Sequence, residues 1–219
     1  KLREEGSSRM VLCNDEATLL YLANQAAITP HVWLSTESDL EKPDRLIFDL
    51  DPPKDNFSIV QDGARDLKKI FDKLDMKAYV MTTGSKGMHV VVPLDGKSDF
   101  DASRDFAKKV AAKLAGDHPD KYTTETRTNK RKERLFLDYL RNAYGQTAVA
   151  PYALRARKGA PVATPLEWHE AGKKDMSRQK YNHSNIFRRL SAKDDPWKDL
   201  NKHSYSIKTA SEKFDKTFS

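Results

Sequence analysis

Residues 44–55, with the sequence DRLIFDLDPPKD, contain two aspartates at the end of an apolar run. Two prolines follow them, and prolines end a strand because they donate no ladder hydrogen bond. Alternate strand residues share a face, so Asp49 and Asp51 project together. The opposite, core-facing side carries Leu46, Phe48 and Leu50. Ionised carboxylates beside apolar surface are costly unless they are paired or bind a metal.

A third carboxylate is expected beside this pair. Asp138 lies in the apolar stretch LFLDYL, where strand parity separates it from the core-facing Leu135 and Leu137. All-oxygen ligation suits Mn²⁺ or Mg²⁺ rather than zinc. Acids on neighbouring strands can hold the two ions needed for in-line phosphoryl or nucleotidyl transfer. We therefore predict that Asp49, Asp51 and Asp138 are catalytic, metal-binding residues.

A purely structural role is the alternative for this motif. Asp51 could simply begin a turn, while Asp138 pairs with a nearby arginine. Phosphatases of the haloacid dehalogenase type also begin with an apolar run and Asp-x-Asp. Their second aspartate is usually followed by Gly-Thr or Gly-Val, whereas Pro52 and Pro53 follow here. That difference counts against a phosphatase of this type.

Residues 82–93, TTGSKGMHVVVP, form a glycine-rich turn between two strand candidates. Glycines permit positive φ and a close backbone approach. Lys86 at the tip could meet a phosphate, assisted by backbone N–H groups. His89 faces the side opposite to its neighbours Met88 and Val90. A histidine inside an apolar strand favours a functional role for this turn. An ordinary hairpin turn with an exposed lysine is the alternative.

Two basic stretches are candidate anion sites. Arg155 and Arg157 lie two residues apart in an extended segment, and paired guanidiniums suit a triphosphate. The alternative is a charged, solvated edge strand. Lys130, Arg131 and Lys132 could contact a nucleic-acid backbone, although such runs are often solvated loops.

Composition limits the classes of protein. The 219 residues suffice for one sizeable core, and the net charge of +7 favours an anionic partner. The single cysteine, Cys13, excludes an internal disulfide and suits a reducing compartment. No apolar run is long enough to span a bilayer and no signal-peptide pattern opens the sequence, so we expect a cytoplasmic protein without membrane contact.

The periodicity of apolar residues predicts mixed structure in one domain, residues 1–219. Helices are expected over residues 15–27, 58–75, 101–115, 185–191 and 196–200. Strands are expected over residues 30–35, 45–51, 77–83, 88–94 and 135–140, with an extended segment over 147–157. Gly116 is the expected stop of the third helix. The order favours an α+β or α/β sheet with flanking helices.

The motifs DLDP, TGSKGMHVVVP and LDYLRN…TAVAPYALRARKGAPVATPLEW occur in a characteristic order between about His31 and Trp197. In this order they resemble the polymerase domain of bacterial ligase D, in the archaeo-eukaryotic primase superfamily. The resemblance implies an α+β primase-type catalytic core with a mixed or antiparallel RRM-like sheet flanked by helices. It also implies template-dependent DNA/RNA primase-polymerase activity, adding NTP or dNTP to a primer 3′-OH with Mn²⁺ or Mg²⁺. The implied setting is double-strand break repair by non-homologous end joining, with DNA, Ku and a DNA ligase as partners.

The resemblance also assigns roles residue by residue. Asp49, Asp51 and Asp138 match the metal-ligating acids. The nucleotide-binding positions are His31, Thr83, Ser85, Lys86, Gly87, His89, Arg155 and Arg157. Thr83 replaces the Ser of the usual S-G-G-K-G-x-H motif, and Ser85 replaces its second Gly. After the third acid many members read W-S-Q-N and later Lys-Thr, whereas this chain has YLRN at residues 139–142 and Gln146-Thr147.

Family domains have a further N-terminal portion, which contributes to the sheet and to DNA contacts. We expect this chain to lack most of it. Two other functions remain open from the residues alone: a metal-dependent phosphoesterase or nuclease using the same acids, and a non-catalytic DNA-end-binding relative.

Overall fold

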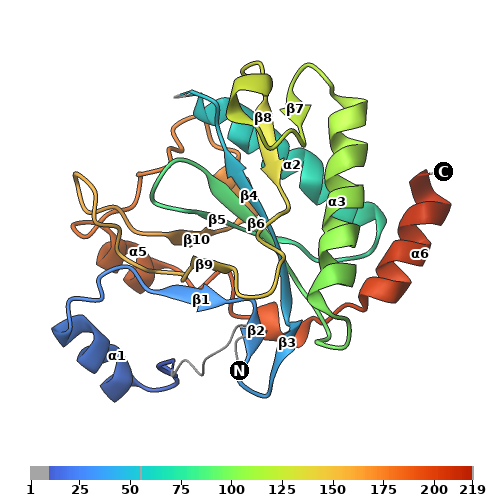
Figure 1. Ribbon diagram of the computed structural model, residues 1–219. Helices are drawn as coiled ribbons and strands as arrows, with labels where there is room; N and C mark the ends of the chain where they lie inside the picture. Colours follow the sequence, from blue (N-terminus) through green and yellow to red (C-terminus); the bar gives the residue numbers. More distant parts are fainter. Residues whose placement is uncertain (1–9, 55, 219) are drawn as a thin grey trace.

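The computed structural model describes residues 10–54 and 56–218, which fold around a six-stranded sheet (Figure 1). The strand order is β10-β5-β6-β4-β8-β7. All neighbours are antiparallel except the parallel pair β7 and β8. The strands are β4 (Arg45–Asp51), β5 (Tyr79–Thr82), β6 (Met88–Pro93), β7 (Tyr122–Thr123), β8 (Leu135–Asp138) and β10 (Thr164–Leu166). The predicted α+β class with a mixed sheet is confirmed.

The main core lies between one face of this sheet and two long amphipathic helices, α2 (Phe57–Lys73) and α3 (Phe100–Asp117). As strand parity predicts, β4 sends alternate apolar side chains into this core while its aspartates point the other way. The buried members from β4 are Leu46, Phe48 and Leu50. A C-terminal helix, α6 (Ile207–Phe218), packs against α3. This helix was not predicted.

The other face of the sheet is covered by smaller pieces. Strands β1 (His31–Trp33) and β9 (Thr147–Val149) form an antiparallel pair in which His31 lies opposite Val149. A hairpin of β2 (Ser35–Thr36) and β3 (Asp39–Pro43) follows β1. A second apolar cluster supports this layer and contains Leu34, Ile47, Val91, Phe100 and Ala148. The layer forms a wall beside the aspartates of β4.

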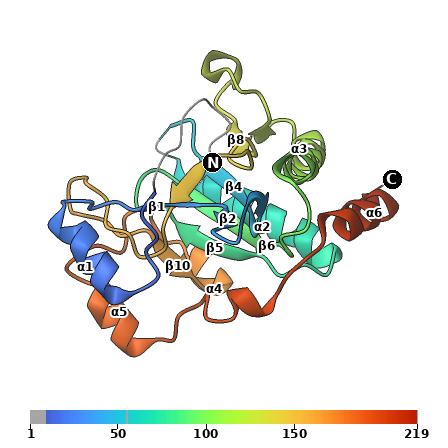
Figure 2. The same cartoon turned by 60° about the horizontal axis from the view of Figure 1, so that its bottom comes forward.

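Helix α1 (Glu16–Asn24) forms where predicted, with Asp15 accepting the N–H of Thr18 as its N-cap. Its predicted inward face does not pack, because no residue of α1 is buried. Leu19, Leu20 and Tyr21 each remain more than half exposed. Figures 1 and 2 show the helix at the margin of the molecule, away from the six-stranded sheet. An amphipathic pattern predicts a helix, but it does not specify which surface covers its apolar face.

Three other expectations differ from the structure. Helix α3 continues through Gly116 to Asp117, so this glycine does not stop it. The segment expected to be extended over 147–157 is a strand only to Val149. Beyond it the chain turns, and the N–H of Arg157 bonds back to the carbonyl of Arg155. In place of the helix expected over 196–200, residues 196–199 form turns and Leu200 begins the 3-10 helix η2 (Leu200–Lys202).

The remaining elements are short and lie at the periphery. They are η1 (Thr128–Lys130), α4 (Trp168–Ala171) and α5 (Ile186–Ala192). Within the described part of the chain, none of the helices has the length and apolar character needed to cross a membrane.

Candidate active site

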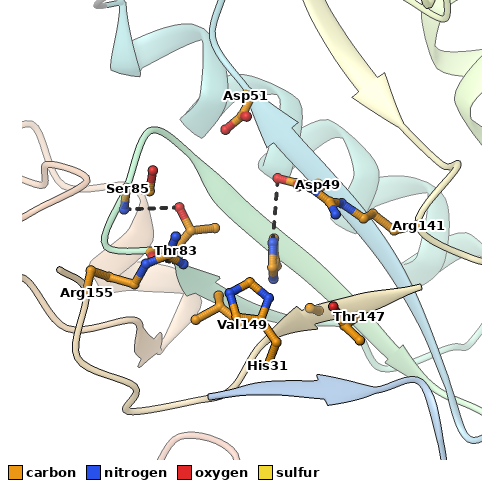
Figure 3. Close-up of a pocket in the computed structure, with 11 residues that line it drawn as sticks. His31, Asp49, Asp51, Thr83, Ser85, Arg141, Thr147, Val149 and Arg155 are labelled. Atoms are coloured by element: carbon orange, nitrogen blue, oxygen red, sulfur yellow. Dashed lines mark hydrogen bonds and ion pairs between the residues drawn. The ribbon is translucent and has the colours of Figure 1, made fainter. Parts of the chain in front are cut away.

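A polar pocket opens between β4, β6, the 83–87 turn and the β1–β9 wall (Figure 3). It brings together residues that are far apart in the sequence. The lining residues are His31, Asp49, Asp51, Thr83, Ser85, His89, Arg141, Thr147, Ala148, Val149 and Arg155. Seven of these are predicted site residues, so half of the fourteen predicted positions converge on one cavity.

Asp49 lies at the centre of the pocket and is buried. It occupies the middle strand, opposite His89 on β6 and opposite Asp138 on β8. One carboxylate oxygen, Oδ1, lies 3.5 Å from Nε2 of His89, and the other, Oδ2, accepts a hydrogen bond from Nε of Arg141 at 3.2 Å. Burial opposes the charge of Asp49, but His89 and Arg141 outweigh it and hold its pKa below the usual value. Asp49 is therefore ionised at neutral pH.

The other two acids are stabilised less well. Asp51, at the exposed end of β4, pairs with Phe136 through the strand ladder, but its carboxylate makes no hydrogen bond or ion pair with any residue that the structure describes. Desolvation and the neighbouring charge of Asp49 raise its pKa. Asp138 uses one oxygen to accept the N–H of Leu140, at 2.8 Å. Its pKa is also raised, first by burial and then by Asp49. The three carboxylates thus repel one another, as groups that share a bound cation do.

The three aspartates lie near one another, but they do not converge on a single point as the ligands of one metal ion would. Asp138 lies beside Asp49 in strand register without lining the pocket itself. Among residues 10–54 and 56–218, no three acid, histidine or cysteine side chains converge closely enough to enclose a single ion. The metal-ligand assignment of the three acids therefore stays a prediction.

The 83–87 turn is organised by the hydroxyl of Thr83. This oxygen donates to the carbonyl of Gly87 at 3.2 Å and accepts the N–H groups of Ser85 and Gly87 at 3.3 and 3.4 Å. Gly84 has a φ of +64°, and Gly87 lies so close to β4 that an added Cβ would be 1.7 Å from the carbonyl oxygen of Leu50. The Thr83 hydroxyl is thus committed to the turn, which leaves Ser85 to present a hydroxyl to the pocket.

The two arginines predicted as a pair are separated. Arg155 lines the pocket and donates to the carbonyl of Thr83 at 3.3 Å. Arg157 is exposed beyond the following turn and does not line the pocket. Partial desolvation, followed by the charges of Arg155 and Arg141, holds the pKa of His31 below its usual value. The His31 imidazole is therefore neutral at pH 7.

Sequence reasoning missed four lining residues, Arg141, Thr147, Ala148 and Val149. Arg141 follows β8 in the turn that reads YLRN, where its departure from the Gln of the family motif was the available signal. Thr147 and Val149 face the pocket because β9 pairs with β1. That pairing joins distant residues and leaves no local pattern.

A second, basic hollow adjoins the pocket, and Asp51 borders both. Lys86 lies here rather than in the first pocket. The predicted DNA-binding residues Arg131 and Lys132 line it, whereas Lys130, at the end of η1, does not. The guanidinium of Arg131 lies 3.9 Å from the centre of the Phe136 ring and donates to the carbonyl of Glu125. Asp51 therefore stands between an arginine-containing pocket and a lysine- and arginine-lined hollow.

Among curated proteins, this chain is 34% identical over 168 residues to the bifunctional non-homologous end joining protein LigD of Bacillus subtilis, covering 76% of this chain and 27% of that protein. It is 32% identical over 199 residues to the multifunctional non-homologous end joining protein LigD of Pseudomonas aeruginosa, covering 90% of this chain and 24% of that protein. The chain thus spans about a quarter of the length of these relatives.

Among solved structures, the polymerase domain from Mycobacterium tuberculosis ligase D in complex with DNA superposes with a TM-score of 0.77 at 26% identity. The match covers 86% of this chain and 68% of that chain. The predicted α+β fold therefore agrees with an experimentally determined polymerase domain.

The mixed sheet and its similarity to a polymerase domain define the class of protein as a nucleotidyltransferase domain. A family model described as "LigD, primase-polymerase domain" matches residues 1–197. The chain belongs to this LigD primase-polymerase family. The resemblance inferred from its motifs is confirmed.

Proposed function

We propose that this chain adds nucleotides to the 3′-OH of a DNA primer by template-dependent, metal-assisted nucleotidyl transfer. The observation that carries the proposal is the position of Asp51, which borders both the pocket and the basic hollow. A triphosphate in the pocket and a DNA strand in the hollow would meet at the acids. The solved relative was determined in complex with DNA, which supports a nucleic acid in this role.

The donor set fits divalent metal. Asp49, Asp51 and Asp138 offer only oxygens, and the raised pKa values of Asp51 and Asp138 report negative charge that a cation would relieve. We assign these three residues to two Mn²⁺ or Mg²⁺ ions. Bound divalent metal would supply activation of the 3′-OH and neutralisation of the leaving pyrophosphate.

The chain's own residues position the substrates. Arg155 and Ser85 line the pocket and are placed to bind the triphosphate, and Lys86 adds a positive charge from the adjoining hollow. His31, Thr147 and Val149 form the wall that would receive the nucleotide's sugar and base. His89 also lines the pocket, where its Nε2 lies 3.5 Å from Oδ1 of Asp49 and helps to position that carboxylate. Arg157, being exposed, would act at most on the outer end of the triphosphate.

The biological setting is also part of the proposal. The relatives are named as non-homologous end joining proteins. That name describes the full-length relatives, of which this chain matches about a quarter. We propose that this chain fills gaps at broken DNA ends in the cytoplasm, alongside Ku and a DNA ligase. NTP and dNTP are both candidate substrates.

The test is extension of a labelled primer–template containing a short gap, with NTPs or dNTPs and with Mn²⁺, Mg²⁺ or a chelator. We expect metal-dependent lengthening that Asp49→Ala abolishes. Asp101→Ala, which removes a solvent-exposed aspartate of α3, serves as the matched control and should retain activity. Extension by Asp49→Ala at the wild-type rate would contradict the assignment of the acids.

The same assay distinguishes the two alternatives. Shortening of the labelled strand would indicate a metal-dependent nuclease built on the same acids. DNA binding without metal dependence or turnover would indicate a non-catalytic end-binding protein.

A further inference from the structure

Arg141 holds a position in the acid cluster that the proposed reaction does not use. Its Nε donates to Oδ2 of Asp49 at 3.2 Å. It is also a source of positive potential for Asp51, for Asp138 and for His31. One guanidinium thus contributes positive charge to all three carboxylates. Figure 3 shows it reaching Asp49 from the side opposite the 83–87 turn.

The position of Arg141 is fixed by the next residue. Asn142 is buried, and its side chain forms hydrogen bonds with both the N–H and the carbonyl of Ile47, at 2.8 and 2.7 Å, and with the carbonyl of Tyr139. These bonds join the turn after β8 to the strand that carries Asp49. The backbone of Arg141 is therefore held beside the acids by a buried polar clamp.

The side chain of Arg141, in contrast, is partly exposed to solvent. It is 41% exposed, whereas that of Asp49 is 10% exposed. Leaving Asp49 would return the guanidinium to water without opening the core.

We infer that Arg141 is the resident counter-cation of the acid cluster, that it competes with divalent metal for Asp49, and that it contacts the triphosphate once it is displaced. A carboxylate oxygen bonded to a guanidinium is not available as a metal ligand until that bond breaks. Arg141 also lines the pocket that contains Arg155 and Ser85, so a phosphate there would attract the released side chain. Metal binding and nucleotide binding are then coupled through one residue.

This inference rests on the proposed role of Asp49 as a metal ligand. The first experiment is calorimetric titration of the 219-residue chain with MnCl₂ alone, without nucleotide. We expect Arg141→Gln to bind Mn²⁺ roughly five- to tenfold more tightly than wild type, the amount expected for losing one competing, partly exposed ion pair. Near-ultraviolet circular dichroism confirms that the variant is folded.

Arg155→Gln is the matched control, because it removes a guanidinium from the same pocket that makes no hydrogen bond to Asp49. It should change Mn²⁺ affinity less than about twofold, since screening weakens a charge that makes no contact. Unchanged or weaker Mn²⁺ binding by Arg141→Gln would overturn the inference. An equal effect of Arg155→Gln would also overturn it, since the effect would then be one of general charge.

Asp49→Asn separates the two proposals. If it binds Mn²⁺ as wild type does, the metal-site assignment itself has failed. If it loses Mn²⁺ while Arg141→Gln has no effect, only the present inference has failed. At saturating Mn²⁺, a non-hydrolysable nucleoside triphosphate should bind Arg141→Gln about fivefold more weakly than wild type. Equal binding would overturn the contact with the triphosphate.

Discussion

Gly87 lies at the point where the 83–87 turn approaches β4 most closely. A Cβ there would lie 1.7 Å from the carbonyl oxygen of Leu50 and 3.1 Å from a carboxylate oxygen of Asp51. Backbone on both sides would have to move to accommodate it. The glycine is therefore needed both for folding and for holding the turn against the acids.

Gly87→Ala should lower the free energy of unfolding by about 2 kcal/mol or more, because overpacking against fixed backbone forces strand displacement. Gly116→Ala is the control. Gly116 is helical, and a Cβ added there would meet no neighbouring atom within 4 Å, so alanine should stabilise α3 by roughly 0.5–1 kcal/mol. Chemical denaturation measures both. Equal stability of Gly87→Ala and wild type would show that the close approach is not maintained in solution.

The pKa values of the acids lead to a pH-dependent prediction. Asp51 and Asp138 have raised pKa values, so their contribution to stability is full at low pH and is lost as the pH rises through those values. Asp49, whose pKa is lowered, contributes in the opposite sense and loses its contribution as the pH falls. Without metal, the protein at pH 7 thus carries the repulsion of ionised Asp51 and Asp138.

Mn²⁺ should relieve this repulsion only when the carboxylates are ionised. At a concentration near 100 times its Kd, it should raise Tm by roughly 5–11 °C at pH 7 and by much less at pH 4.5. Differential scanning fluorimetry provides the comparison, with Asp49→Asn as the variant that should not respond. An equal rise at both pH values would argue against binding by these acids.

At the scale of the element, a buried ion pair connects α5 to α4 and to the edge of the sheet. Arg189 bonds both oxygens of Glu170, at 2.7 and 2.8 Å, and also the carbonyl of Pro165 on β10. Burial opposes the charge of Glu170, but Arg189 and Lys193 hold its pKa well below the usual value. This contribution to stability is present at neutral pH and is lost as the pH falls through the lowered pKa.

Arg189→Met should cost roughly 3–5 kcal/mol, because it leaves a buried carboxylate without its main partner. Arg188→Met, one residue earlier on the same helix and exposed, should change stability by less than about 0.5 kcal/mol. Urea denaturation at pH 7 distinguishes them. Similar losses for the two variants would mean that the buried pair contributes no more than a surface charge.

The elements predicted correctly are those whose pattern is local. Helix α2 buries one face, so a period of 3.6 identifies it, whereas β4 and β6 are buried on both faces and are identified as short apolar runs bounded by turn signals. Helix α6 has buried residues at Ile207, Ala210 and Phe214, but the charged tail obscured this spacing. The extended segment was overestimated because nothing local indicates that the chain turns after Val149.

The residues of the candidate site also fall into two groups: those that a local pattern predicts and those that only tertiary contacts bring together. Strand parity placed Asp49, Asp51 and Asp138 on one side, and the structure sets Asp138 opposite Asp49. The parity argument failed for Arg155 and Arg157, because it assumes an extended chain and the chain turns there. The β1–β9 wall depends on contacts between residues more than 100 positions apart in the chain, which only tertiary structure reveals.

At the scale of the whole molecule, positive charge is arranged around the acids. The basic hollow contains Lys86, Arg131 and Lys132 beside Asp51. Helices α2 and α3 cover the opposite face of the sheet. A DNA backbone in the hollow would have its phosphates neutralised close to the proposed reaction centre, and its affinity would depend on salt.

Replacing Lys130, Arg131 and Lys132 together by glutamine should weaken DNA binding and reduce the slope of log K against log salt by about 0.9 for each phosphate that the variant no longer neutralises. The control replaces Lys68, Lys69 and Lys73 of α2, the helix on the other face of the sheet. Fluorescence anisotropy over a salt series measures both slopes. A slope unchanged in the first variant would place the DNA elsewhere.

The edge strand β10 has a consequence for association with other proteins. Its central residue, Pro165, has no N–H to donate, and its carbonyl already accepts a hydrogen bond from Arg189. A strand from another chain would find neither donor nor acceptor at this point, so the sheet cannot be continued there by β-augmentation. At the β10 edge, this fold can thus contact other folded units, or a second copy, without its sheet being extended into theirs.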